Sequence, residues 1–212
     1  MTGFPVVILI SGRGTNLQAI VDEVRAGKLP ADIRAVISNN PEAAGLQQAR
    51  AAGLHTEVVD HRAYPTHAAF EQALAQAIDR HTPTLVALAG FMRILGRDFI
   101  ERYHGRLINI HPSLLPKYPG LDTHARAIAA SETQHGASVH FVIPDVDAGP
   151  VILQAAVPVL PNDTPATLAE RVLKEEHRIY PLVIRWFAEG RLALRDGHAL
   201  LDGKSCPRLN SQ

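Results

Sequence analysis

Cysteine is almost absent from this chain of 212 residues, and neither sign of charge is in excess. The one cysteine, Cys206, cannot form a disulfide within the chain or supply a cysteine-rich zinc site, so we expect a cytoplasmic protein. Lys and Arg together number 21, as do Asp and Glu, and no basic run stands out. This balance argues against a nucleic-acid partner but allows a local site for a small anion.

Long apolar runs are also missing. The apolar stretch in MTGFPVVILI has no basic flank and ends at the polar SGRGTN, which is too early for a membrane span. We therefore predict a buried first strand there and no membrane partner. Hydrophobic residues make up 46% of the chain, which is enough for a sizeable core. The length favours one domain, which we expect to cover residues 1–212.

Strand and helix patterns alternate through the first half of the chain. This alternation is typical of an α/β protein with a mostly parallel, Rossmann-like sheet and helices on both faces. The predicted strands cover residues 4–11, 32–40, 55–60, 84–90 and 106–110, and the predicted helices cover residues 17–27, 41–53, 67–81 and 96–105.

The second half has a different pattern. Strands at 137–143 and 150–160, joined by the turn PDVDAG, predict an antiparallel hairpin. A long helix is expected over 165–190, and the tail 198–212 is expected to form a peripheral strand or loop. We find no repeat or linker that would divide the chain.

The stretch SGRGTN, residues 11–16, follows the first predicted strand and opens a helix. Its glycines, Gly14 among them, allow a tight turn, and the unpaired N–H groups at a helix N-terminus favour an anion such as phosphate. Thr15 and Asn16 add side-chain donors. The pattern fits neither a Walker A loop nor a dinucleotide fingerprint, because Leu17 stands where a third glycine belongs. An ordinary strand-to-helix turn would use the same residues, so both interpretations stay open.

Asn109 and His111 stand at the end of a predicted strand, directly before a proline-rich turn. Side chains alternate along a strand, so these two point to the same side. Strand ends are where open α/β sheets bind ligands. An amide can donate to a developing oxyanion, and an imidazole can move a proton near neutral pH. A histidine that caps the following turn is the alternative.

The hairpin turn adds His140, Asp145 and Asp147. Aspartates in such turns usually cap their own backbone, but a carboxylate beside an imidazole would orient it and raise its basicity. The sequence does not decide whether Asp147 meets His111.

A buried strand leads into AGFMRIL, residues 89–95. Either this segment only joins strand to helix, with Phe91 and Leu95 in the core, or it forms a pocket wall with Arg93 reaching a ligand carboxylate. Glu176, in the long helix, lies on a solvated face or in a site. The histidines show no H-E-x-x-H or comparable pair, so we expect no catalytic metal.

Several stretches together resemble the formyltransferase family, in particular its folate-dependent glycinamide ribonucleotide transformylases. They run in order from about residue 6 to residue 190: LISGRGTNLQAI, LAGFMRIL, INIHPSLLPKYPGLDTH, HGASVHFV, DAGPVILQA and EHRIYPLVI. The resemblance implies formyl transfer from 10-formyltetrahydrofolate to glycinamide ribonucleotide in purine biosynthesis, by a monomer or homodimer. It also implies that the first half binds the ribonucleotide phosphate and that the second half binds folate and performs catalysis.

The resemblance also implies roles for individual residues. They are catalysis by Asn109, His111 and Asp147; ribonucleotide binding by Gly14, Thr15, Asn16 and Glu176; folate binding by Arg93, Ile94, Leu95 and Val142; and supporting roles for Met92 and His140. One position departs from the pattern, because His67 stands where several relatives carry arginine, and a ligand contact there is in doubt.

The implied mechanism begins with attack of the glycinamide amine on the formyl carbon. Asn109 and a protonated His111 would donate to the resulting oxyanion, while Asp147 would keep His111 charged. Two alternatives stay open. A formyltetrahydrofolate deformylase would use the same trio on water but would not need the phosphate turn, and a non-catalytic folate or nucleotide sensor would not need the trio.

Overall fold

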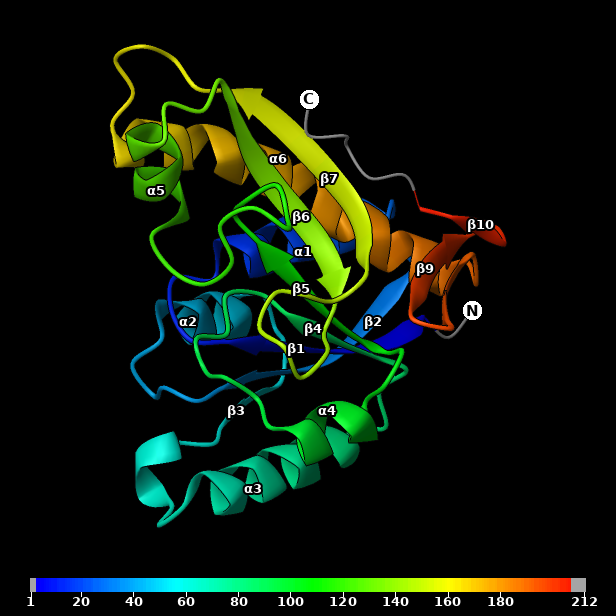
Figure 1. Cartoon of the computed structure of the whole chain (residues 1–212). Coiled ribbons are helices and arrows are strands. Elements are labelled where there is room, and N and C mark those ends of the chain that lie inside the picture. The colour runs from blue at the N-terminus through cyan, green and yellow to red at the C-terminus, as the bar shows by residue number, and fades with distance from the viewer. Residues whose placement is uncertain (1–2, 207–212) are drawn as a thin grey trace. The chain divides into compact units, whose positions relative to one another are not determined.

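The computed structural model of this chain describes residues 3–206, which fall into two compact units, Met1–Asn109 and Ile110–Gln212. Each unit has its own set of elements (Figure 1). The expectation of a single domain over the whole chain stays a prediction.

The first unit is built on parallel strands in the order β3-β2-β1-β4-β5. The strands are β1 (Phe4–Ile10), β2 (Ala31–Ser38), β3 (Thr56–Val58), β4 (Leu85–Leu88) and β5 (Leu107–His111), the last of which ends in the second unit. All four residues of β4 are buried, as expected for a strand covered on both faces.

The helices of this unit form two pairs. They are α1 (Thr15–Arg25), α2 (Ala44–Ala51), α3 (His67–Asp79) and α4 (Arg97–Arg102), with a short 3₁₀ turn η1 (His61–Ala63) before α3. Helix α1 contacts α2, and α3 contacts α4. Because β-α-β crossovers are right-handed, this strand order places one pair on each face of the sheet. Figure 1 shows α3 and α4 together below the strands.

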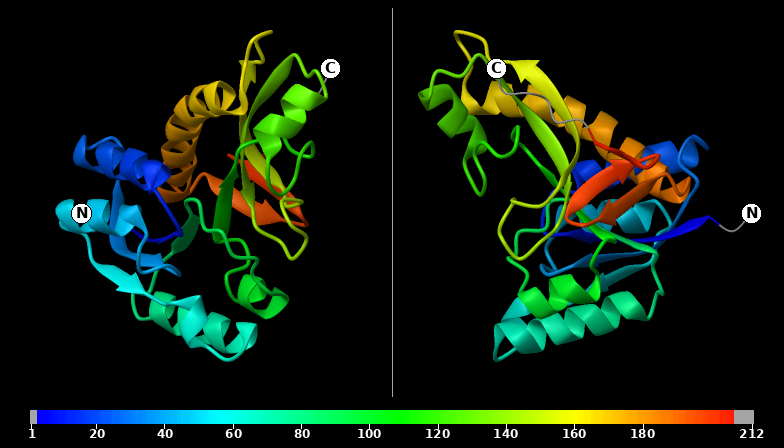
Figure 2. Two further views of the ribbon diagram at one scale, coloured as in Figure 1. Left: turned by 90° about the vertical axis from the view of Figure 1, so that its left-hand side faces the viewer. Right: turned by 45° about the vertical axis from the view of Figure 1, so that its right-hand side comes forward.

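The second unit contains the antiparallel hairpin β6 (Gln134–Phe141) and β7 (Val151–Pro158). The long helix α6 (Pro165–Ala188) packs along this hairpin, and the short α5 (Thr123–Ala129) contacts α6 (Figure 2). A separate antiparallel sheet, in the order β10-β9-β8, contains β8 (Leu192–Arg195), β9 (His198–Leu201) and β10 (Lys204–Ser205).

The predicted fold class, parallel α/β first and an antiparallel hairpin later, is confirmed. Several boundaries differ from the prediction; β6, for example, covers Gln134–Phe141 and not 137–143. Helix α2 begins at Ala44 and not at Pro41, because the residues between them form a turn in which the Ala43 N–H donates to the Asn40 carbonyl. The tail is a folded sheet up to Ser205, whereas the predicted part beyond Cys206 lies outside the described residues.

Within residues 3–206, no helix has the length and apolar character that crossing a bilayer requires. The longest, α6, instead carries charged residues along its exposed side and buries the other.

Candidate active site

The turn after β1 is shaped by a close approach between two backbones. Gly14 is the N-cap of α1 and has a φ of 76°, and a Cβ added there would lie 2.6 Å from the Cα of Gly45. The Gly45 N–H also donates to the Gly12 carbonyl at 3.0 Å. Only glycine fits at position 14. The close contact with Gly45 therefore fixes the position of the unpaired N–H groups at the start of α1. Asn16, in this first turn, is buried.

Ser11 links the carboxyl ends of three strands. Its hydroxyl donates to Asn39 Oδ1 at 2.5 Å and accepts from the Met92 N–H at 2.7 Å. Its own N–H donates to the Gly90 carbonyl at 3.1 Å. The strand order reverses between β1 and β4, which is where sheets of this kind bind ligands. Sequence reasoning missed Ser11 and Asn39, although each is a polar residue directly after a buried strand.

The 89–95 segment combines both interpretations that the sequence left open. Phe91 and Leu95 are buried, as the core interpretation expects. Met92 and Ile94, however, are 69% and 70% exposed, so two large apolar side chains project from the segment. Apolar side chains in that position offer a surface for a flat ligand.

Arg93 lines a pocket of about 130 Å³ together with the start of α3. The other lining residues are His61, Tyr64, Pro65, Thr66, His67 and Phe70. The buried Nε of Arg93 has no hydrogen-bond partner among residues 3–206, which leaves a donor for an anion. His67 hydrogen-bonds through Nε2 to the Ile94 carbonyl at 3.0 Å, so it holds the segment that presents Arg93.

In the second unit, Asp147 lies between two histidines. Its Oδ2 is 3.3 Å from His111 Nδ1, and its Oδ1 is 3.6 Å from His140 Nε2. The Gly120 N–H donates to Asp147 Oδ2 at 2.8 Å. The contact between Asp147 and His111, which the sequence left undecided, is therefore present. Asp147 has a φ of 53°, a left-handed conformation that aspartate adopts more readily than most residues.

The pKa values of this pair fall below their usual ranges. Burial lowers the pKa of His111, and it outweighs the Tyr118 carbonyl and the Asp147 charge, which raise it. Burial acts to raise the pKa of Asp147, but hydrogen bonds from His140 and the Gly120 N–H, with the charge of His111, bring it below the ordinary value. At neutral pH the resting imidazole of His111 is therefore neutral and the Asp147 carboxylate is ionised.

The hydrogen bonds of His111 decide which nitrogen carries its hydrogen. Nε2 is 2.9 Å from the Tyr118 carbonyl oxygen, and a carbonyl can only accept, so Nε2 is the donor. Nδ1 then faces the Asp147 carboxylate with a lone pair. This contact becomes attractive once Nδ1 binds a proton, so the site is built to take up one proton during a reaction.

Two further buried histidines belong to this environment and were not singled out in the sequence. The rings of His124 and His135 are 5.1 Å apart. Burial lowers the pKa of both, that of His135 to about 4, and the charge of His111 acts in the same direction. Both are neutral at neutral pH, so neither of them adds a positive charge beside His111.

The remaining candidate residues differ in burial. Asn109 is half-buried on β5, opposite Leu88 of β4, and two residues before His111. Glu176 is 8% exposed on α6, so the interpretation of a solvated face is wrong for this carboxylate. Val142, directly after β6, is half-buried, and Asp145 is exposed.

Comparison with known proteins defines the class. A family model described as formyl transferase matches residues 5–184. The chain therefore belongs to the formyl transferase family. It is 50% identical, over 95% of both chains, to phosphoribosylglycinamide formyltransferase of Escherichia coli strain K12, and 45% identical, over 96% of both, to that of Haemophilus influenzae.

Solved structures show the same fold. The phosphoribosylglycinamide formyltransferase of Coxiella burnetii matches with a TM-score of 0.94 and 52% identity over 97% of both chains. A formyltetrahydrofolate deformylase from Pseudomonas putida matches with a TM-score of 0.85 and 27% identity, over 95% of this chain and 71% of that one.

Proposed function

We propose that this chain transfers the formyl group of 10-formyltetrahydrofolate to the amine of glycinamide ribonucleotide. The products are formylglycinamide ribonucleotide and tetrahydrofolate, in purine biosynthesis. The observation that carries the proposal is the 50% identity, over 95% of both chains, to an E. coli protein named for this activity. The deformylase is a weaker match, at 27% identity and 71% coverage of its own chain.

The ribonucleotide is assigned to the turn after β1. Gly14, Thr15 and Asn16 bring the N-terminal N–H groups and polar side chains of α1 to the phosphate. Glu176, a buried carboxylate on α6, is assigned to the ribonucleotide as well. The close packing of Gly14 on Gly45 supports this assignment, because it fixes the donors before the ligand arrives.

Folate is assigned to the 89–95 segment and to the residue after β6. Met92 and Ile94 offer exposed apolar surface, and Arg93 has an unused donor for a carboxylate. Leu95 and Val142 are assigned to folate as well, and Leu95 would act from the core beneath the 89–95 segment. His67 has a supporting role here, since it holds the Ile94 carbonyl.

Catalysis is assigned to Asn109, His111 and Asp147. The amine nitrogen attacks the formyl carbon, and the carbonyl oxygen becomes negative. The surplus proton of the amine passes, directly or through water, to the neutral His111. Asn109 donates a hydrogen bond to the oxygen, and the positive charge of the new imidazolium stabilises it. The two N–H groups of that imidazolium face the Tyr118 carbonyl and Asp147, whose carboxylate stabilises its charge. The proton then leaves with the folate nitrogen as the carbon–nitrogen bond breaks.

This sequence of steps changes one expectation. Asp147 does not keep His111 charged at rest, because burial outweighs it. His111 acquires its charge within the reaction, and His140 has the positioning role of holding the other oxygen of Asp147. No step requires a metal. A cytoplasmic monomer or homodimer that binds small molecules, and neither nucleic acid nor membrane, fits this chemistry.

The test is to follow 10-formyltetrahydrofolate consumption by absorbance with and without glycinamide ribonucleotide. We expect consumption that requires the ribonucleotide, with formylated product appearing at the same rate. Equal consumption without it would identify a deformylase. Saturable folate binding with no turnover would identify a sensor. Either result would overturn the proposal.

A further inference from the structure

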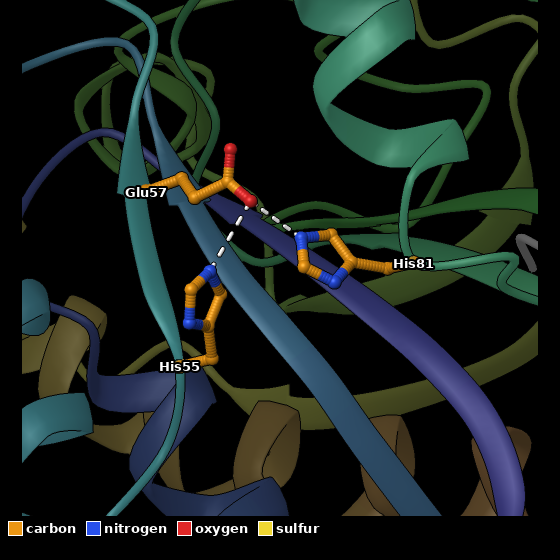
Figure 3. Close-up of side chains that lie close together, drawn as sticks. All are labelled: His55, Glu57 and His81. Atoms are coloured by element: carbon orange, nitrogen blue, oxygen red, sulfur yellow. Dashed lines mark hydrogen bonds and ion pairs between the residues drawn. The ribbon is translucent and has the colours of Figure 1, made fainter.

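Two histidines and a glutamate of the first unit converge at one carboxylate oxygen. His55 precedes β3 and Glu57 lies on it, two residues later, so both point to the same side of the strand. His81 follows α3 and approaches from that side (Figure 3). The Nε2 atoms of His55 and His81 lie 3.2 Å and 2.5 Å from Glu57 Oε1.

We propose that His55, Glu57 and His81 bind a zinc ion. Their three ligand atoms lie within 4.8 Å of one another. In a tetrahedral site with bonds of about 2.0–2.1 Å, ligand atoms stand about 3.3 Å apart, so a small inward rotation suffices. The His55 side chain is 58% exposed and has room for that movement.

The chemistry of the cluster favours a cation at its centre. Both imidazole N–H groups point at the same oxygen, and one metal ion can replace both protons once each ring carries its hydrogen on the other nitrogen. Glu57 accepts hydrogen bonds from His55, His81 and Arg80, as an ionised carboxylate does. Two imidazoles and one carboxylate are ligands that suit zinc. These three ligands leave the fourth position of a tetrahedral site for water.

Arg80 provides a test of the proposal, because its charge should change the affinity for zinc in a predictable direction. Its guanidinium donates to the other oxygen, Glu57 Oε2, at 2.6 Å, and so leaves Oε1 to face the histidines. Its positive charge nevertheless opposes a second cation nearby. Removing that charge should therefore tighten metal binding.

This site is separate from the proposed chemistry. His55 stands at the amino end of β3, whereas sheets of this kind bind substrates at the carboxyl ends of their strands. A zinc ion here would tie the start of an edge strand to the end of α3. Its role would be to stabilise the fold, and formyl transfer would not depend on it.

The test is a calorimetric titration of metal-free protein with Zn²⁺, with Mg²⁺ as the negative control. The variants are His55→Ala and His81→Ala, with His104→Ala as a matched exposed histidine outside the cluster. We expect wild type and His104→Ala to bind one ion at this site. Each ligand variant should lose more affinity than the roughly 10–100-fold typical of a residue that only supports a ligand.

Arg80→Gln should bind zinc more tightly than wild type. Zinc should also raise the melting temperature of wild type but not of His55→Ala or His81→Ala, whose metal-free melting temperatures serve as the folding control. Equal stoichiometry and affinity in wild type and both ligand variants would overturn the proposal. So would the absence of zinc binding to wild type, or weaker binding to Arg80→Gln.

Discussion

At the scale of single residues, two opposing effects determine the charge of His111. Burial removes the imidazole from water and favours its neutral form, while Asp147 favours the charged form. A neutral imidazole beside an ionised carboxylate is a base that gains stabilisation when it accepts a proton. That property suits a reaction in which an amine must lose a proton as it attacks.

Asp147→Asn tests this balance. The variant removes the charge that raises the pKa of His111, so the acidic limb of the pH profile of kcat/KM should move to lower pH. The imidazolium formed in the reaction loses its counter-charge, so kcat should fall by at least ~10²-fold. Both quantities come from steady-state rates between mildly acidic and neutral pH. A limb that moves to higher pH, or an unchanged kcat, would contradict the account.

At the scale of elements, the turn between β6 and β7 positions Asp147. A Cβ added to Gly149 would lie 1.8 Å from the Phe141 carbonyl oxygen, so the turn closes only with glycine there. His140 Nδ1 donates a hydrogen bond to the same Phe141 carbonyl oxygen at 2.9 Å. The close packing of Gly149 therefore helps to position two residues of the site, His140 and Asp147.

Gly149→Ala should force this turn to move and carry Asp147 with it. We expect a loss of about 1–3 kcal/mol in the free energy of unfolding, as is usual for an inserted methyl group with no space. We also expect kcat to fall while ribonucleotide affinity is retained. Ala148→Ser, an exposed change in the same turn, is the control for both measurements and should leave them near wild type. Normal kcat in Gly149→Ala would show that the turn does not position the site.

The elements differ in how well the sequence predicts them. The long helices are predicted because their apolar periodicity is strong, and the inner strands because they are continuous apolar runs, as in the fully buried β4. Helix α5 and strand β8 are missed, because they are short and largely half-exposed, which leaves a weak pattern. Strands β9 and β10 lie in the tail that is expected only as a peripheral strand or loop.

The features of the site also differ in how well the sequence predicts them. The spacing of Asn109 and His111 on one strand can be seen in the sequence, because strand geometry is local. The contact between His111 and Asp147 cannot, because it depends on where the hairpin turn folds back. The approach of His81 to His55 and Glu57 is hidden for the same reason, since it comes from a different element.

At the scale of the whole molecule, the assigned ligand groups come from both units. The phosphate turn and the 89–95 segment lie in Met1–Asn109, and His111, Asp147 and Glu176 lie in Ile110–Gln212. The chain divides directly between Asn109 and Ile110, within β5.

The most direct test compares single-turnover formyl transfer in wild type, Asn109→Ala and His111→Ala with both ligands saturating. We predict that each variant loses at least ~100-fold in rate, Asn109→Ala because it removes an oxyanion donor and His111→Ala because it removes the group that takes up the proton. Equilibrium binding of ribonucleotide and folate should stay near wild type. Near-normal transfer in either variant would contradict the assignment of that residue to the reacting carbonyl.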